Sequence, residues 1–245
     1  MPQRLPVTTP RQAGLIAGLG YLAIFVLAVF ANFFVRERLV DPADATATFA
    51  NIAASDLLFR SGIVSFLIVF VLDVVVAWAL YVLFRSVSWD RSLLAAWFRL
   101  VYTVFLGVAL VFMLGVAHLA AGAEYLSAFD AGQVQAHAML LLEAFDYAWL
   151  IGLVCFGLHL VLIANLLWVS GWAPKLLSIL LAAAGVAYVL DTVARALLAN
   201  YADYATLFLM IVALPSVIGE LWLGLWLLLR GGSGVPTDRP EAAAA

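Results

Sequence analysis

The sequence contains little charge. Of its 245 residues, 11% are Asp, Glu, Lys or Arg, whereas soluble domains carry about 25% charged residues. The formal net charge is −3, and the cations do not gather into a basic patch of the kind that binds nucleic acid. The composition therefore excludes an ordinary soluble domain, and we expect no nucleic-acid partner.

The sequence also contains few residues that form disulfides or hold metals. Its single cysteine, Cys155, excludes an internal disulfide and a cysteine-only metal site. His118, His137 and Glu143 are donor types that suit zinc, but their spacing matches no metal motif. His118 and the third histidine, His159, lie at different depths of their segments and cannot share a haem. We predict no metal and no cofactor, and keep His118, His137 and Glu143 as the only metal candidates.

Long apolar runs make up most of the sequence. Hydrophobic side chains make up 67% of the sequence. Six apolar segments run from about 13–35, 57–84, 92–121, 137–169, 174–198 and 205–230. Each exceeds the ~20 residues that a helix needs to cross a bilayer. The pattern predicts an all-α membrane protein with a bundle of six transmembrane helices at 13–231. A cytoplasmic N-terminal segment at 1–12 and a disordered cytoplasmic tail at 232–245 flank it.

The longest loop connects the first two spans and contains a helix-start signal. Asp41 suits an N-cap position and Pro42 suits the first helical position. These residues predict a short interfacial helix, outside the hydrocarbon layer, from Pro42 to about Ala53. Ser55 then stands where it can cap the second span.

Lys and Arg are unequally divided between the two ends of the predicted bundle. Six spans place both termini at one end, which then carries seven cations against four at the other end. The seven are Arg4, Arg11, Arg85, Arg91, Lys175, Arg230 and Arg239, and the four are Arg36, Arg38, Arg60 and Arg195. Because cytoplasmic loops are enriched in Lys and Arg, we expect an inner-membrane protein with both termini cytoplasmic.

Four ionisable residues lie at similar depth in four different spans: Asp73, Arg99, His159 and Glu220. At 1.5 Å per residue, each lies about 12–18 Å from the end that holds the termini. Charges at this depth are costly and are tolerated when they are paired. Asp73 and Arg99 belong to consecutive antiparallel spans and should form an ion pair. Small residues beside Glu220 and His159 favour an inward direction for both, so we expect one connected polar layer.

This polar layer allows more than one function. Intramembrane ionisable residues are functional candidates by default, so the layer could bind or transport a small ligand or a proton. It could instead fix helix register in a structural or accessory subunit, either of a membrane assembly or of a homo-oligomer. An intramembrane enzyme is a third alternative, but the sequence has no GxSxG motif. We favour binding or transport, which requires a water-reachable path to Glu220 and His159.

Three stretches of the sequence resemble a known family. They are GLVCFGLHLVLIANLLWVSGWAPKLL at 152–177, LPSVIGELWLGLWLLLRG at 214–231 and ASDLLFRSG before the second span. These stretches resemble the bacterial multi-pass membrane family known as domain of unknown function 4386, from about Gly14 to Gly231. The resemblance implies a compact multi-pass bundle. It implies no activity and transfers no catalytic residue.

The cation count leads to a prediction about topology. Alkaline phosphatase fused after Ala245 should be inactive, and a fluorescent protein fused there should fluoresce, because both termini are expected in the cytoplasm. A phosphatase fusion after Ala54, in the loop at the other end, serves as the matched control and should be active. Phosphatase activity of the Ala245 fusion would contradict the prediction.

Overall fold

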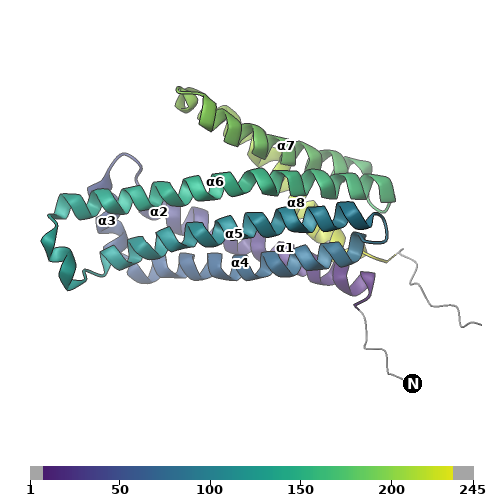
Figure 1. Cartoon of the computed structure of the whole chain (residues 1–245), viewed down its shortest axis with the longest axis horizontal. Helices are drawn as coiled ribbons and strands as arrows, with labels where there is room; N and C mark the ends of the chain where they lie inside the picture. Colours follow the sequence, from purple (N-terminus) through teal and green to yellow (C-terminus); the bar gives the residue numbers. More distant parts are fainter. Residues whose placement is uncertain (1–7, 234–245) are drawn as a thin grey trace, which may run out of the picture.

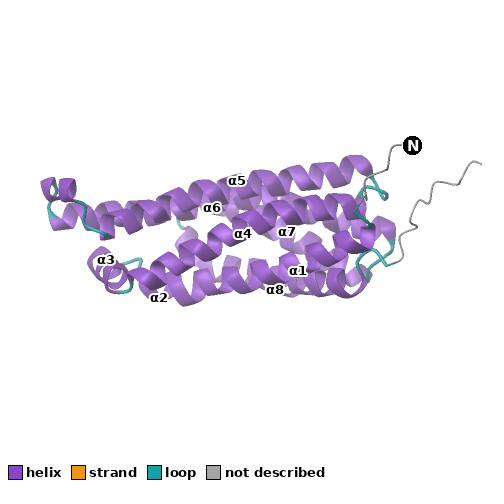
Figure 2. Cartoon of the chain, turned by 90° about the horizontal axis from the view of Figure 1, so that it is seen from below, coloured by secondary structure: helices purple, strands orange, loops and turns teal. Residues whose placement is uncertain are grey.

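The computed structural model describes residues 8–233, and within that range the chain is helical without strands (Figures 1 and 2). The elements are α1 Pro10–Val29, η1 Phe30–Arg36, α2 Glu37–Leu39, α3 Ala45–Ala54, α4 Asp56–Phe84, α5 Trp89–Ala120, η2 Glu124–Ala128, α6 Ala131–Ser170, α7 Lys175–Leu197, η3 Tyr201–Tyr204 and α8 Ala205–Arg230. The outermost parts of the predicted terminal segments, 1–7 and 234–245, lie outside the described residues.

Six of the helical stretches are long and apolar enough to cross a membrane, which confirms the predicted six-span bundle. The first runs from Pro10 to Leu39 because α1, η1 and α2 are continuous. Its middle part, η1, is π-helical. The fourth begins at Ala131, before the predicted start, because Asp130 and Gln133 form a capping box there.

The short outer helix is present, but it begins later than the sequence analysis predicted. α3 starts at Ala45, and its cap is Asp44, whose carboxylate accepts a hydrogen bond from the Ala47 amide at 2.8 Å. Asp41 and Pro42 form a turn instead, in which the Asp41 carboxylate accepts from the Ala43 amide at 3.0 Å. Asp44, rather than Asp41, is therefore the N-cap, and the helix begins three residues later than predicted. Ser55 stands at the start of α4, but its side chain makes no capping hydrogen bond.

The six long helices form a closed ring. α1 packs against α4 and α8, and the order continues from α4 through α5, α6 and α7 to α8. Neighbours in the ring are therefore neighbours in the sequence, except where the first helix meets the last. Figure 2 shows α1 and α8 side by side, with α3 beyond them at the far end of the bundle. We call the end that holds α3, η2 and η3 the loop end, and the opposite end the terminal end.

All six long helices pack together at the terminal end, whereas α7 and α8 do not join the shared core at the loop end. The buried core at the terminal end contains residues of all six long helices. The core at the loop end contains residues of the first span, α3, α4, α5 and α6, but none of α7 or α8. Figure 1 shows the reason, since α7 rises away from α6 toward its loop end. The α7–α8 pair thus joins the bundle through one half of its length.

Close packing and a side-chain clamp join α1 to α8 at the terminal end. A Cβ atom on Gly18 would collide with the backbone of Leu228, so only glycine permits this approach. The Arg11 guanidinium donates to the carbonyl oxygen of Leu228 at 2.8 Å and to that of Gly231 at 3.1 Å. These carbonyls at the end of α8 have no partner within their own helix. Arg11 therefore satisfies them and closes the ring.

A second close approach joins α6 to α7. A Cβ atom on Gly157 would collide with the carbonyl oxygen of Gly185, and one on Gly185 with the carbonyl oxygen of Gly157. Small residues at such contacts let two helices pack backbone against backbone. This contact holds the α7–α8 pair against the rest of the ring.

The α6–α7 contact leads to a prediction about stability. Gly157→Ala should lower the free energy of unfolding by about 1–3 kcal/mol, the usual cost of overpacking, measured by thermal unfolding in detergent micelles. Gly132→Ala is the matched control, because a Cβ there meets only the Asp130 carboxylate at 3.3 Å. The control should destabilise less, since the Asp130 side chain needs to shift by only a few tenths of an ångström and alanine is a better helix former than glycine. Equal stability of the two variants would refute the contact.

Candidate functional site

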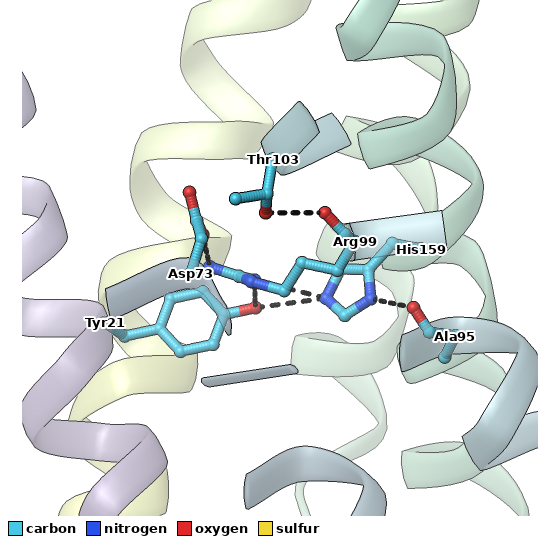
Figure 3. Close-up of polar contacts among 6 residues, drawn as sticks. All are labelled: Tyr21, Asp73, Ala95, Arg99, Thr103 and His159. Atoms are coloured by element: carbon cyan, nitrogen blue, oxygen red, sulfur yellow. Dashed lines mark hydrogen bonds and ion pairs between the residues drawn. The ribbon is translucent and has the colours of Figure 1, made fainter. Parts of the chain in front are cut away.

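An ion pair lies at the centre of the bundle. The Arg99 guanidinium of α5 donates through Nη2 to Oδ1 of Asp73 on α4, at 2.5 Å, and both side chains are 1% exposed (Figure 3). The structure thus forms the ion pair that the sequence predicts. Each charge compensates the other, which lowers the cost of holding both at this depth.

The remaining Arg99 donors bind two further helices. Nη1 donates to the Tyr21 hydroxyl of α1 at 2.7 Å and to Nε2 of His159 on α6 at 3.2 Å. His159 Nδ1 lies 2.9 Å from the carbonyl oxygen of Ala95, which can only accept, so Nδ1 carries the proton. With Nε2 facing the guanidinium, His159 is neutral. Asp73, Arg99, Tyr21 and His159 thus form one cluster, which we call the arginine cluster.

Tyr21 was not among the residues selected from the sequence. A signal for it existed, because Gly14, Ala17, Gly18 and Tyr21 lie on one face of the first span, and small residues at that spacing turn a face inward. The ring of Tyr21 also lies under the guanidinium, with its centroid 4.7 Å from the Arg99 Cζ atom. The cluster therefore combines hydrogen bonds with a cation–π contact.

Glu220 stands apart from the arginine cluster. Its Oε1 atom accepts a hydrogen bond from the Tyr188 hydroxyl at 3.2 Å. Within residues 8–233, no hydrogen bond or ion pair joins Glu220 to Asp73, Arg99 or His159. The expected single layer is therefore not joined by direct hydrogen bonds, because Arg99 directs Nη1 to Tyr21 and His159 and Nη2 to Asp73.

Glu220 and most of the arginine cluster line one cavity of about 340 Å³. All six long helices contribute to its wall, which includes Asp73, Arg99 and Glu220, while His159 lies outside it. Aromatic rings form much of the rest: Tyr21, Phe25, Phe33, Tyr102, Trp149, Phe156 and Tyr188. We call this space the central cavity.

A second cavity, of about 410 Å³, adjoins the first on the side of the loop end. Both are lined by Asn32, Trp149 and Leu153, so the two spaces are neighbours. The charged residues of the second cavity are Arg36, Glu37, Asp146, Asp191 and Arg195. We call it the outer vestibule. The outer vestibule thus lies between the loop end of the bundle and the cavity that Glu220 lines.

The π-helical segment η1 places Asn32 at the junction of the two cavities. The Asn32 amide donates to the Ala28 carbonyl at 3.1 Å and accepts from Arg36 at 3.4 Å. Arg36 in turn pairs with Asp146 of α6 at 2.5 Å, which ties the first span to α6. π-helical turns inside α-helices occur frequently at functional sites. Asn32 is therefore a candidate for control of passage between the two cavities.

The two ionised groups of the arginine cluster keep unused hydrogen-bonding capacity. Asp73 Oδ2 and Arg99 Nε are buried and have no hydrogen-bond partner within the described part of the chain. Asp73 also lines the central cavity. A buried acceptor without a partner costs about 1–3 kcal/mol, and the Asp73 side chain is 1% exposed, so Oδ2 is an unpaired acceptor enclosed by protein.

The metal candidates do not come together. His118 Nε2 binds the Tyr125 hydroxyl at 2.5 Å, and His137 Nδ1 binds the Gln133 carbonyl at 2.7 Å. Among residues 8–233 there is no group of three His, Cys, Asp or Glu side chains that could hold a metal ion. His118, His137 and Glu143 thus form no centre in the structure.

These features define a polytopic helical membrane protein with a buried polar cluster beside a central cavity. The family described as Domain of unknown function (DUF4386) matches residues 16–231, and the chain belongs to this family. The chain is also similar to a protein of Archaeoglobus fulgidus whose name is "Uncharacterized protein", with 29% identity over 169 residues, 69% of this chain and 83% of the relative. No solved structure matches the chain. Neither name assigns an activity, and a bacterial origin stays a prediction.

The central ion pair leads to a prediction about stability. Asp73→Asn should lower the free energy of unfolding by roughly 3–5 kcal/mol, because it leaves the Arg99 charge buried without compensation. Replacing both partners, as Asp73→Leu with Arg99→Met, should restore much of that loss. Thermal unfolding in detergent micelles measures each variant.

The Asp56–Arg60 pair provides a matched control for this experiment. Its side chains are about half exposed, at 48% and 46%, and lie one helical turn apart. Asp56→Asn should change the free energy of unfolding by about 1 kcal/mol or less, as for surface pairs in general. If Asp73→Asn costs no more than Asp56→Asn, the central pair does not hold the bundle together.

Proposed function

We propose that the protein binds a small molecule in the central cavity, and that this molecule enters from the loop end. The observation that carries the proposal is the pair of adjoining cavities that leads to Glu220, a carboxylate without a cationic partner among the described residues. With both termini in the cytoplasm, as the cation count predicts, the loop end faces the outside of the inner membrane.

The character of the central cavity supports binding of a small molecule. Its volume of about 340 Å³ falls within the range of roughly 300–1,000 Å³ that is usual for ligand pockets. Its wall is mainly aromatic and aliphatic and carries a few polar groups from facing helices. Such a combination orients a ligand through its polar atoms and holds it through apolar contact.

The arginine cluster has a different role from Glu220 in this proposal. Arg99 ties α5 to α4, α1 and α6 through three partners, which fits a structural lock. Glu220 makes one hydrogen bond and faces the cavity. A purely structural subunit should have a closed polar layer, and the cavity beside Glu220 does not fit that expectation.

Catalysis receives less support than binding. Both ring nitrogens of His159 are engaged, one by Arg99 and one by the Ala95 carbonyl, so His159 has no free position to act as a base. Cys155 is half-buried on α6 but does not line the central cavity. Within the described part of the chain, Cys155 and His159 therefore do not form a nucleophile–base pair at the central cavity.

Transport is a second candidate, favoured by the backbone around the cavity. The π-helical segment η1 lies on one side of the opening, and Pro215 of α8 lies near the other. Proline removes a backbone hydrogen bond within a helix, and such breaks are usual in transporters near their binding sites. A carrier would expose the same cavity alternately to the two ends of the bundle.

Cysteine labelling tests access to the cavity. In a Cys155→Ala background, Ser216→Cys should react with N-ethylmaleimide because Ser216 lines the central cavity. Ser178→Cys is the matched control, because Ser178 is also buried but lines neither the central cavity nor the outer vestibule. A thiol without cavity access reacts only during local opening, and each 1.4 kcal/mol of opening slows labelling tenfold. Ser216→Cys should therefore react at least about tenfold faster.

The side of labelling separates the two candidates. Membrane vesicles of both orientations are treated with a thiol reagent that does not cross the bilayer. Labelling of Ser216→Cys from the loop end alone supports a binding protein, and labelling from both ends supports a carrier. Equal and slow labelling of Ser216→Cys and Ser178→Cys would refute access to the cavity and with it the proposal.

A further inference from the structure

The charges around the central cavity do not balance. Asp73 and Glu220 contribute two carboxylates, and Arg99 contributes one guanidinium. His159 adds no charge, because its Nδ1 proton is donated to Ala95 and its Nε2 faces Arg99. Since Arg99 is paired with Asp73, Glu220 either carries a proton or requires a cation that the described residues do not supply.

The position of Glu220 makes this imbalance costly. Within residues 8–233 Glu220 has one hydrogen bond, from the neutral Tyr188 hydroxyl, so its ionised form at mid-depth of the bundle needs a cation nearby. The Asp73 carboxylate also lines the central cavity, although its Oδ2 atom is itself buried. A positively charged group with N–H or N–CH₃ contacts in the cavity satisfies the Glu220 carboxylate.

The rest of the cavity wall suits a positive charge as well. The faces of aromatic rings attract cations, and this attraction reaches about 2 kcal/mol or more where water is excluded. Tyr21, Tyr102, Trp149, Phe156 and Tyr188 all line the central cavity. The ring faces and the two carboxyl groups disfavour an anion in the cavity, and the one cation there, Arg99, is already paired with Asp73.

The outer vestibule also contains more negative than positive side chains. Its carboxylates are Glu37, Asp146 and Asp191, and its cations are Arg36 and Arg195. Three acids against two bases leave an excess negative charge at the entrance. Arg36 pairs with Asp146, and Arg195 pairs with Asp191. The excess is therefore the single carboxylate of Glu37, which favours cations at the entrance to a small extent. The outer vestibule and the central cavity therefore both favour cations over anions.

The central cavity also reaches the lipid-facing surface. Phe33 of η1 and Val217 of α8 line it, although they are 57% and 46% exposed. They stand where the α7–α8 pair leaves the loop-end core. A ligand in the cavity thus has apolar side chains and hydrocarbon on one side, and the carboxylates on the other.

From these observations we infer that the ligand is a lipophilic monovalent cation, an ammonium group with apolar substituents whose head lies at Glu220. The inference rests on the proposed function, since it names the class of molecule that the cavity binds. The cationic head balances the Glu220 charge, and the substituents contact the aromatic wall and the side open to lipid.

Protection of a cysteine tests the inference. The probe is benzyltrimethylammonium, added to the Ser216→Cys protein in the Cys155→Ala background before N-ethylmaleimide. It should slow labelling, whereas benzyl alcohol, which is neutral, and benzenesulfonate, which is an anion, should not. Glu220→Gln should raise the half-protecting concentration by roughly thirtyfold or more, as expected when one partner of a buried charge pair is removed. Glu124→Gln, at an exposed position, should leave it unchanged.

The outcomes separate the inference from the proposed function. If Ser216→Cys is labelled but the three probes protect equally or not at all, access stands and the cationic ligand is refuted. If the cation protects Glu220→Gln as well as it protects the parent, Glu220 does not bind the head. Thermal unfolding of Glu220→Gln confirms folding, and Glu220→Asp, which keeps the charge, should retain most of the protection.

Discussion

The cost of holding a charge in a hydrocarbon layer governs this structure. Arg99 lies at mid-depth, is 1% exposed, and cannot lose its proton in a protein, so its surroundings must supply compensation. Asp73 supplies the charge, and Tyr21 and His159 supply acceptors. Since these partners come from three other helices, one side chain fixes the register of four elements. Helix association in lipid lacks the hydrophobic drive of soluble cores, which makes such a lock valuable.

Packing divides the bundle into two halves with different properties. At the terminal end all six helices share a core, and glycines bring α1 against α8 and α6 against α7. At the loop end the α7–α8 pair leaves the core, and the cavity lies where it leaves. Glu220 and most of the arginine cluster line that cavity without a direct hydrogen bond between them. The close packing at the terminal end holds the Arg99 charge in place. The free volume at the cavity leaves Glu220 accessible to a ligand within the same bundle.

Much of the architecture follows from the sequence, and the parts that do not have identifiable causes. The apolar runs predict the six spans, and depth counting predicts the Asp73–Arg99 pair. The separation of Glu220 could not be predicted, because it depends on how the donors of Arg99 are distributed among partners from distant helices. The π-helical turn at Asn32 has no local sequence signal. The splay of α7–α8, which creates the cavity, is a property of tertiary packing alone.

The contact between α1 and α8 has a consequence for biosynthesis. Asp73 and Arg99 lie in consecutive helices, so their charges can neutralise each other as soon as that hairpin has left the ribosome. Arg11, in contrast, must wait for the carbonyls of Leu228 and Gly231, more than 200 residues later in the chain. The ring can close only after the last helix has been inserted. Until then the first helix presents its glycine face to lipid or to a chaperone, and a truncated chain keeps that face open.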